Sequence, residues 1–364
     1  MEIAGRRIGQ GEPAYLVAEL SANHGQDLEQ AIRLVRAAAD AGADAVKLQT
    51  YTPDTITLRS DNPYFRIGSG TVWDGRTLYD LYADAYTPWE WHQQLQGEAH
   101  EQGIELFSSP FDDTAVELLE GLNMPAFKIA SFEIVDLGLI ARVARTGKPM
   151  IISTGMATLP EIAEAVATAR AAGARDLVLL KCTSAYPAAP EDANLLTMHS
   201  MAETFGLPVG LSDHTLGIAV PVAAAALGAV MIEKHFTLSR ADPGPDSGFS
   251  LEPDAFAEMV REVRTAERAI GQVSYEPTAK EAASRILRRS LFVVADVHAG
   301  EELTRENVRS IRPGHGLHTR HLTDVLGHTA ARDVARGTPL SWDLVGPKTE
   351  VARHDDGDAV TQRA

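Results

Sequence analysis

Eight short apolar runs, each followed by a segment of helical periodicity, constrain the fold of this chain more than any other feature of its sequence. In the first helical segment, apolar residues between Leu28 and Ala39 recur at helical spacing, which places them on one face of a helix. Eight such units within about 270 residues match a (β/α)8 barrel, whereas an open doubly wound sheet usually has fewer strands. The sequence therefore predicts an α/β fold of the TIM-barrel type. The predicted strands cover residues 15–20, 45–50, 104–109, 126–131, 149–154, 177–184, 208–214 and 230–236.

The stretch at residues 51–87 interrupts this alternation. It has no strand pattern and contains several glycine and proline residues. Connections of this length in compact domains are usually functional or disordered, and the many aromatic residues argue against disorder. We therefore expect an ordered lid over the barrel mouth. Its aromatic residues are Tyr64, Phe65, Trp73, Tyr79, Tyr82 and Tyr86.

The composition changes after Gly271, which indicates a second domain. A polar segment comes first, and a weak internal repeat follows, with Asp296-Val297 and Asp333-Val334 at equivalent positions. Glycine, leucine and valine follow both pairs at the same offsets, as expected for a small β-rich domain with two similar halves. The predicted division is a barrel domain at 1–272, a linker at 273–290, the β-rich domain at 291–347 and a disordered polar tail at 348–364.

The charge balance limits the possible partners. The chain has 33 lysine and arginine residues against 50 aspartate and glutamate residues, a formal net charge of −17. Phosphates would be repelled over most of such a surface, so we expect no binding to nucleic acid or to membranes. No apolar run reaches the roughly 18 residues of a spanning helix, the first residues lack the pattern of a secretory signal, and the single Cys182 cannot form an internal disulfide. These features predict a soluble cytoplasmic protein.

Four of the seven lysines fall inside predicted strands, at Lys47, Lys128, Lys181 and Lys234. Lysine is rarely buried without a partner. Either each of the four forms a separate buried ion pair, or all four line one pocket where the strands end, the place at which barrels of this type carry their reactive groups. We favour the pocket, because one anionic ligand accounts for all four lysines.

The same strand ends are rich in hydroxyl groups. Lysines combined with hydroxyl and backbone N–H donors form a typical cradle for phosphate or carboxylate. Any single serine at such a position is more often structural, so the inference depends on their concentration over successive strands. The hydroxyl residues are Ser108, Ser109, Ser131, Ser153, Thr154, Thr183, Ser184 and Ser212.

Two histidines and one carboxylate complete the set. His214 and His235 end neighbouring strands about 4.8 Å apart, close enough to bind one divalent ion, and Mn²⁺, Mg²⁺, Co²⁺ and Zn²⁺ are all chemically admissible. Glu19 ends the first strand, where it serves either as a general base or as the salt-bridge partner of a nearby lysine. Cys182 lies in an apolar strand and is interpreted as a packing residue. The residues alone leave aldolases, enolpyruvate condensations and epimerases open.

At these residues the sequence resembles the sialic acid synthase family, whose members condense phosphoenolpyruvate with an amino sugar to make a nonulosonic acid. The matching motifs occur in the family's order through residue 346, and the C-terminal repeat resembles the family's antifreeze-like (SAF) domain. The resemblance therefore implies a TIM barrel followed by a small β-rich SAF domain. The motifs are AELSANH (18–24), KLQTY (47–51), FSSPFD (107–112), FKIASFE (127–133), IISTGM (151–156), KCTSAYP (181–187), GLSDHT (210–215), IEKHFT (232–237), GPDSGFSLEP (244–253) and IRPGHGL (311–317).

Two segments, 73–92 and 238–253, resemble the branch of the family that uses 2,4-diacetamido-2,4,6-trideoxy-L-altrose and makes pseudaminic acid. Ser247 stands where sialic and legionaminic acid synthases typically have histidine, and Ser184 stands where they commonly have asparagine. Both differences imply an altered sugar pocket. Synthesis of N-acetylneuraminic or legionaminic acid is the alternative, and a metal-dependent aldolase and a non-catalytic sugar- or phosphate-binding protein are more distant ones.

The resemblance also implies a role for each site residue. Glu19 would be the catalytic carboxylate, Lys47 and Lys128 would act on phosphoenolpyruvate, and His214 and His235 would bind the divalent metal, Mn²⁺, Mg²⁺ or Co²⁺. Family members are domain-swapped homodimers, so one arginine of the SAF domain would reach into the barrel of the partner subunit. The residues implied to bind substrate are Ser109, Ser131, Ser153, Ser184 and Ser212 for phosphoenolpyruvate, Tyr186 and Asp246 for the sugar, and this arginine, Arg312.

Overall fold

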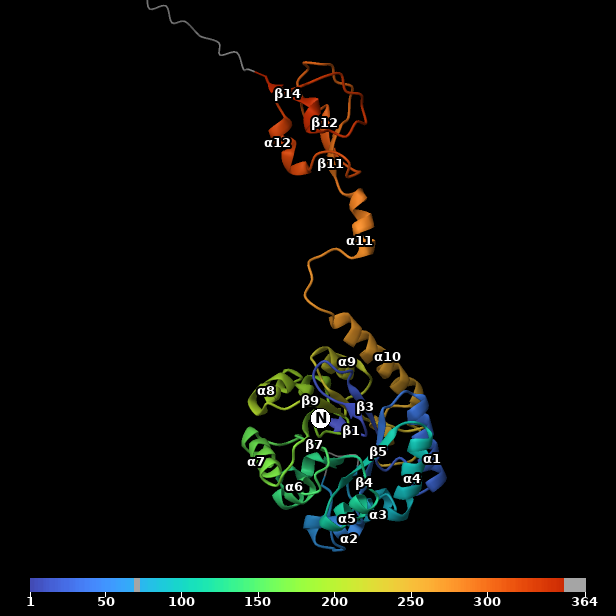
Figure 1. Cartoon of the computed structure of the whole chain (residues 1–364). Helices are drawn as coiled ribbons and strands as arrows, with labels where there is room; N and C mark the ends of the chain where they lie inside the picture. Colours follow the sequence, from blue (N-terminus) through green and yellow to red (C-terminus); the bar gives the residue numbers. More distant parts are fainter. Residues whose placement is uncertain (69–72, 350–364) are drawn as a thin grey trace, which may run out of the picture. The chain divides into compact units, whose positions relative to one another are not determined.

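The computed structural model describes residues 1–68 and 73–349 of the chain (Figure 1). It divides into two compact units, Met1–Gly271 and Gln272–Ala364. The first contains the alternating strands and helices, and the second contains the internal repeat. The predicted tail falls almost wholly on residues 350–364, which lie outside the described part of the chain.

The first unit is built on a closed barrel of eight parallel strands, which confirms the predicted fold class. Successive strands of the chain lie side by side, and the last one closes the ring against the first. All eight predicted strands are present, with ends close to those expected. They are β3 (Tyr15–Glu19), β4 (Ala45–Thr50), β5 (Glu105–Pro110), β6 (Phe127–Ile129), β7 (Met150–Ser153), β8 (Leu177–Cys182), β9 (Val209–Asp213) and β10 (Met231–His235).

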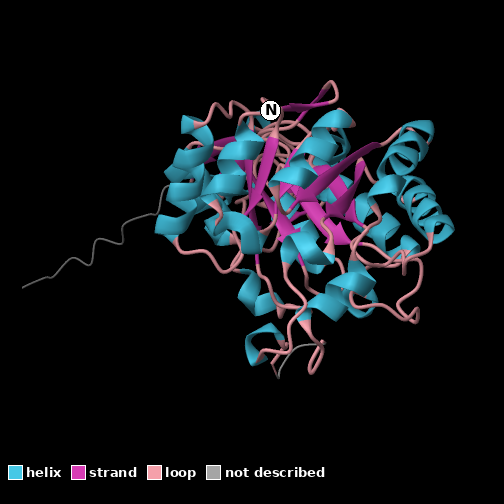
Figure 2. Cartoon of the chain, turned by 90° about the horizontal axis from the view of Figure 1, so that it is seen from below, coloured by secondary structure: helices cyan, strands magenta, loops and turns pink. Residues whose placement is uncertain are grey.

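Helices pack around the outside of the barrel (Figure 2). Local sequence sets the ends of the first one, because the Asp27 side chain accepts a hydrogen bond from the backbone N–H of Glu29, and Gly42 follows with φ +88°, a left-handed conformation that favours glycine. Of the helices in the described residues, none is both long and apolar enough to cross a membrane. The main barrel helices are α1 (Leu28–Asp40), α4 (His92–Glu101), α5 (Asp113–Gly121), α6 (Leu137–Ala144), α7 (Leu159–Ala171), α8 (Leu196–Phe205), α9 (Ala219–Ala226) and α10 (Pro253–Ile270).

Side chains on the strands alternate between the inside of the barrel and the surrounding helices, as the two-residue period of a strand requires. Val17 and Ala45 belong to an inner apolar cluster, whereas Leu16 and Val46 belong to the cluster that includes the helices. The inner cluster lies toward the start of the strands, so the inward-facing polar residues are left at the opposite end. An N-terminal hairpin that the sequence pattern does not reveal, β1 (Glu2–Ile3) with β2 (Arg6–Arg7), also packs on the inner cluster.

The segment at residues 51–87 contains short helices rather than one extended loop. These are α2 (Pro53–Ile56), a 3₁₀ turn at Pro63–Phe65 and α3 (Leu78–Ala85). The indole N–H of Trp73 donates to the backbone carbonyl of Pro245, 3.1 Å away, so the segment reaches the loop that follows β10. This contact at the carboxyl end of the strands agrees with an ordered lid, although α3 was not expected.

The second unit begins with α11 (Ala279–Ser284), a helix inside the stretch that the sequence predicts as a linker. Two antiparallel strand pairs follow, together with the short helix α12 (Leu322–Val325). The pairs are β11 (Ser290–Val293) with β12 (Val308–Ile311), and β13 (His328–Ala330) with β14 (Val345–Lys348).

The two halves of the predicted repeat pair with each other in the second unit. The Asp296 side chain accepts a hydrogen bond from the backbone N–H of Arg336, and the Asp333 side chain accepts one from that of Ala299, both 2.7 Å long. Asp296 corresponds to Asp333 in the repeat, and Ala299 corresponds to Arg336. The two contacts are therefore symmetric equivalents, and the weak sequence repeat reflects a structural one.

Candidate active site

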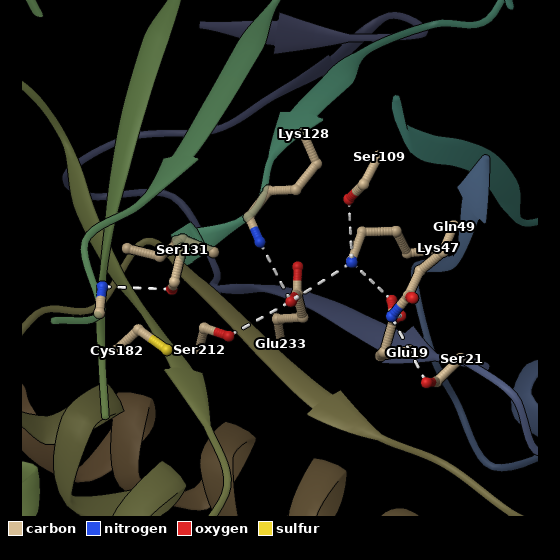
Figure 3. Close-up of polar contacts among 12 residues, drawn as sticks. Glu19, Ser21, Lys47, Gln49, Ser109, Lys128, Ser131, Cys182, Ser212 and Glu233 are labelled. Carbon is tan, nitrogen blue, oxygen red and sulfur yellow. Dashed lines mark hydrogen bonds and ion pairs between the residues drawn. The ribbon is translucent and has the colours of Figure 1, made fainter. Parts of the chain in front are cut away.

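The alternation of side chains separates the four strand lysines into two pairs. Lys47 and Lys128 each follow a residue of the inner apolar cluster by two positions, and their side chains lie inside the barrel (Figure 3). Lys181 and Lys234 each follow by two positions a residue that packs with the helices, so they face outward. The prediction that all four lysines line one pocket is therefore wrong for Lys181 and Lys234.

The two outward lysines have partners of their own. Lys234 forms a buried ion pair with Asp213 and also donates to the backbone carbonyl of Thr215. Lys181 is partly buried and donates to the backbone carbonyl of Cys182, 2.9 Å away. For Lys234, the separate buried ion pair that we weighed against a shared pocket is the correct interpretation.

The two inward lysines form a buried network with two carboxylates. Lys47 Nζ lies 2.7 Å from Glu19 Oε2 and 3.7 Å from Glu233 Oε1, and Lys128 Nζ lies 3.2 Å from the same oxygen of Glu233 (Figure 3). The Ser212 hydroxyl also donates to Glu233 Oε1, at 3.2 Å. Glu19 was expected to be either a general base or the salt-bridge partner of a lysine. The salt bridge with Lys47 is present, and it does not exclude the role of general base.

Burial and pairing act against each other on these groups. Burial disfavours the Lys47 ammonium, but Glu19 and Glu233 outweigh it and raise the pKa of Lys47. Burial also raises the pKa of Glu19, against the charge of Lys47. For Glu233 the charges of Lys128 and Lys47 outweigh burial and lower its pKa. Glu233 is therefore the permanent counter-ion of the two lysines, whereas Glu19 is the stronger base.

Five predicted serines lie on the inner side of the same strand ends. Ser109 accepts a hydrogen bond from Lys47 Nζ at 3.2 Å, and Ser131 accepts one from the backbone N–H of Gly155 at 3.2 Å. A Cβ on Gly155 would lie only 2.2 Å from Ser184 Oγ and 2.7 Å from Ser131 Oγ, so a side chain at this position would displace both hydroxyls. Within the described part of the chain, the buried Ser153 hydroxyl has no hydrogen-bond partner and is available to a ligand.

The other predicted hydroxyls do not join this group. Ser108 faces the helices and forms a 2.6 Å hydrogen bond with Thr50. Thr154 donates to the backbone carbonyl of Leu180 at 3.0 Å, and Thr183 donates to that of Asp192 at 3.0 Å. Ser108 links β5 to β4, and Thr154 and Thr183 stabilise the loops after their strands, so all three hydroxyls have structural roles.

His214 and His235 lie beside the lysine network, with ring centroids 5.2 Å apart. His235 is buried, and its Nδ1 has no hydrogen-bond partner among the described residues. Burial and then the nearby positive groups hold the pKa of His235 well below its usual range, so its imidazole is neutral, the form that binds metals. The neutral imidazole and free Nδ1 of His235 fit the predicted metal site. Nδ1 of His214 is already paired with the backbone carbonyl of Thr183 at 3.0 Å, which leaves Nε2 for a metal. Burial is outweighed by contacts with Cys182 and Thr183, which raise the pKa of His214.

Cys182 has a neighbour that the sequence did not suggest. Its Sγ lies 3.8 Å from His214 Nδ1 and 3.6 Å from Ser184 Oγ. Burial disfavours the thiolate, but the hydrogen bond and charge of His214 outweigh it and lower the pKa of Cys182 to about 6. Cys182 is buried, as expected of a packing residue, but the expectation that no base lies near it is wrong.

The residues implied to bind the sugar lie next to the histidines. The Tyr186 ring is 4.5 Å from that of His214 and 5.3 Å from that of Phe249. Asp246 is buried and accepts a hydrogen bond from the Ser21 hydroxyl. Burial raises the pKa of Asp246, with the Ser21 contact opposing it. An aromatic surface and a carboxylate therefore flank the histidine pair.

Arg312 lies in the second unit, directly after β12, and its side chain is exposed. Its place in the barrel of a partner subunit stays a prediction.

Three residues that complete the inner site were not predicted from the sequence: Glu233, Gly155 and Gln49. Gln49 donates to Glu19 Oε1 at 2.8 Å. A signal was present for two of them, because Glu233 precedes His235 by two residues and Gln49 follows Lys47 by two, which places each pair on one face of its strand. Gly155 carries no such signal, since its role depends on two serines from other loops.

Glu133 makes the stability of the folded protein depend on pH. Burial raises its pKa from the ordinary 4.5 to about 7, and in the described residues its Oε2 has no hydrogen-bond partner. Between these two pH values the folded protein keeps a proton on Glu133 that the unfolded chain loses. The contribution of Glu133 to the free energy of unfolding is therefore complete below pH 4.5 and is lost as the pH rises through about 7. We expect Glu133→Gln to raise the thermal midpoint relative to the parent protein at pH 8 more than at pH 5. If the variant and the parent differed in thermal midpoint by the same amount at both pH values, the raised pKa of Glu133 would be contradicted.

Comparisons with known proteins agree with these motifs. The model of the NeuB family matches residues 34–275, and the model of the SAF domain matches residues 288–346. The chain is 47% identical over 333 residues to the pseudaminic acid synthase of Helicobacter pylori, covering 91% of this chain and 98% of that protein. It is 46% identical over 326 residues to the pseudaminic acid synthase of Campylobacter jejuni subsp. jejuni serotype O:23/36, covering 90% of this chain and 95% of that protein.

A solved structure shows the same relationship. The crystal structure of N-acetylneuraminic acid (sialic acid) synthetase from Leptospira borgpetersenii serovar Hardjo-bovis, in complex with citrate, matches with a TM-score of 0.69 and 31% identity. The match covers 78% of this chain and 94% of that one. The resemblance to sialic acid synthases is thereby confirmed, and the chain belongs to the NeuB family, with a SAF domain at residues 288–346.

Proposed function

We propose that this chain condenses phosphoenolpyruvate with 2,4-diacetamido-2,4,6-trideoxy-L-altrose and water, releasing pseudaminic acid and phosphate. The supporting observation is the buried network of Lys47, Lys128, Glu19 and Glu233 beside two histidines, which combines anion-binding cations with a base. The similarity to two pseudaminic acid synthases, over 91% and 90% of the chain, supports the choice of sugar.

The inner lysines and serines would bind phosphoenolpyruvate. In the free protein the two ammonium groups are balanced by two carboxylates, and several hydroxyl groups and the N–H of Gly155 surround them. Lysine and hydroxyl donors suit both the phosphate and the carboxylate of this substrate. Because packing holds these groups in place before the substrate arrives, little reorganisation opposes the stabilisation of developing charge.

The chemical steps give Glu19 a clear task. C3 of phosphoenolpyruvate forms a bond to the aldehyde carbon of the open-chain sugar, whose oxygen takes up one proton, and water adds at C2 and gives up one. Phosphate then leaves with cleavage of the C2–O bond and carries the second proton of that water, which leaves a ketone at C2. The added water must lose a proton, and we assign that proton to the Glu19 carboxylate. Burial makes Glu19 a stronger base, while Lys47 at 2.7 Å and Gln49 at 2.8 Å hold it in position.

His214 and His235 would hold the divalent metal ion, with the free Nδ1 of His235 as one of the available donors. When bound there, such an ion supplies Lewis-acid polarisation of the sugar aldehyde. Tyr186, whose ring contacts both histidine rings, would orient the sugar against this end of the site.

The test is phosphate release from phosphoenolpyruvate with Mn²⁺, comparing 2,4-diacetamido-2,4,6-trideoxy-L-altrose with N-acetylmannosamine, each with and without a chelator. Release with the altrose sugar that the chelator abolishes would support the proposal. Release with N-acetylmannosamine alone would indicate sialic acid synthesis, and no release with either sugar would contradict both.

Metal binding can be measured apart from turnover. Mn²⁺ is expected to raise the thermal midpoint of the protein, because a ligand that binds only the folded state stabilises it. His235→Ala should lose this shift, while His199→Ala should keep it, since His199 is an exposed residue whose charged neighbour is Glu203. An equal Mn²⁺ shift in all three proteins would exclude His235 as a ligand.

A homodimer with exchanged SAF domains is the assembly that we propose. Exposed apolar side chains follow three strands at the end of the barrel that carries the site, and burying such side chains favours association. Arg312 would then complete the site of the partner subunit. The apolar residues are Phe132 after β6, Met156 after β7 and Leu216 after β9.

Mixing two inactive variants tests this exchange directly. In mixed dimers of Glu19→Gln with Arg312→Ala, the barrel of one subunit and the SAF domain of the other form one intact site. Random exchange would restore about a quarter of the parental activity if Arg312 acts across the dimer. No recovery, in samples shown to contain mixed dimers, would place Arg312 in its own subunit's site.

A further inference from the structure

Trp73 is brought to the candidate site by the long segment that follows β4. Its ring centroid lies 5.6 Å from that of Tyr186. Its indole N–H donates to the backbone carbonyl of Pro245, 3.1 Å away and directly before Asp246 in the chain. Trp73 therefore contacts Tyr186 and the residue before Asp246, and the family resemblance connects both Tyr186 and Asp246 with the sugar.

The aromatic rings form an ordered series that starts at the histidines. The Tyr186 ring lies 4.5 Å from the ring of His214 and 6.3 Å from that of His235, and Trp73 contacts Tyr186. The indole therefore packs on the tyrosine ring that contacts both histidine rings. It is half-buried, so part of it can contact a bound molecule.

This order can be compared with the two candidate sugars. The reacting carbon is the aldehyde, C1, which the proposed function places at the histidines. Both sugars carry an acetamido group at C2. The sugars have opposite configurations at C2, C4 and C5. Their substituents differ at C4 and C6, where the trideoxy sugar has an acetamido group and a methyl group, and N-acetylmannosamine has two hydroxyl groups. The substituents that differ therefore lie at the end of the sugar remote from the aldehyde, and we place this end against Trp73, which packs on Tyr186.

We propose that Trp73 is a specificity-determining residue, whose indole forms an apolar wall for the C4 acetamido methyl and the C6 methyl of the sugar. This inference rests on the proposed function. An indole face gains contact area from methyl groups, whereas hydroxyl groups placed against it lose water without gaining a hydrogen bond. The hydrogen bond to Pro245 fixes the indole before the sugar binds, so little ordering opposes binding.

The experiment compares the parent protein with Trp73→Ala, Trp73→Phe and a matched control, Tyr64→Ala. Tyr64 is an aromatic residue of the same segment that is 89% exposed. The KM and kcat are measured by phosphate release for the trideoxy sugar and for phosphoenolpyruvate. N-acetylmannosamine is measured as a substrate or, if it is not turned over, as a competitive inhibitor.

Trp73→Ala is expected to raise the KM of the trideoxy sugar about ten-fold or more, the usual effect of removing an apolar contact from a pocket. The KM of phosphoenolpyruvate and the affinity for N-acetylmannosamine should stay within about two-fold, because neither depends on this wall. The KM of the trideoxy sugar in Trp73→Phe should lie between those of the parent and Trp73→Ala, and its KM in Tyr64→Ala should equal that of the parent.

An unchanged KM for the trideoxy sugar in Trp73→Ala would overturn the inference, and so would an equal loss of affinity for both sugars. A parent protein that releases phosphate with N-acetylmannosamine alone would instead contradict the proposed function. The two failures are distinguishable, because the second appears in the unmodified protein.

Discussion

Replacing Glu19 with glutamine is expected to lower kcat by a factor of about 10²–10⁴, the range that a positioned general base contributes. Glutamine has nearly the same shape as glutamate but cannot accept the proton of the attacking water. The fold should persist, since Lys47 keeps a carboxylate neighbour in Glu233, 3.7 Å away. Phosphate release gives kcat, and the thermal midpoint reports on folding.

Glu12→Gln is the matched control for this result. Glu12 belongs to the same unit and pairs with Arg7 at 2.5 Å, but Arg7 is an exposed residue. The control should keep parental kcat, which excludes a general effect of losing one carboxylate. If Glu19→Gln kept full activity, Glu19 would not be the general base, and its role would be limited to the salt bridge with Lys47.

Replacing Lys234 with methionine is expected to lower the free energy of unfolding by about 3–5 kcal/mol, because the change leaves the Asp213 carboxylate buried without its counter-ion. Lys234 and Asp213 side chains are 1% and 2% exposed, so water cannot replace the missing partner. Since Lys234 faces the helices, the folded variant should keep the KM for phosphoenolpyruvate. Denaturant unfolding and phosphate release measure the two effects separately.

Two further variants make this result specific. The double variant Lys234→Met/Asp213→Asn removes both charges and should recover part of the lost stability, which identifies the pair as the cause. Lys128→Met, in contrast to Lys234→Met, should raise the KM for phosphoenolpyruvate, because Lys128 faces the inside of the barrel. A rise in this KM as large in Lys234→Met as in Lys128→Met would disprove the separation of the strand lysines into two faces.

Much of the fold could be predicted because its signals are local. Apolar runs at the strands, periodic apolar residues in the helices and glycine after a helix each depend on a few neighbouring residues. The same is true of the repeat, whose two aspartates at 296 and 333 form equivalent hydrogen bonds. The N-terminal hairpin and α3 escaped prediction, because each is too short to show a clear period.

The candidate site was predictable in its residue types but not in its connections. The lysines, serines and histidines stand out in the sequence, whereas the partner of each becomes visible only when distant strands meet. Lys128 and Glu233 are 105 residues apart in the chain, and they meet across the inside of the barrel. Cys182 and His214 likewise come together only because β8 and β9 are neighbours.

The sequence by itself determined that this chain forms a barrel with a polar, lysine- and serine-rich end, because strand and helix periods follow from local chemistry. Only the tertiary structure decided which lysines serve that end. Lys47 and Lys128 point into the barrel and share Glu233, while Lys234 points to the helices and takes Asp213. The physical reason is that burying a charge is costly without a partner, and closure of the barrel determines which partner each lysine can reach.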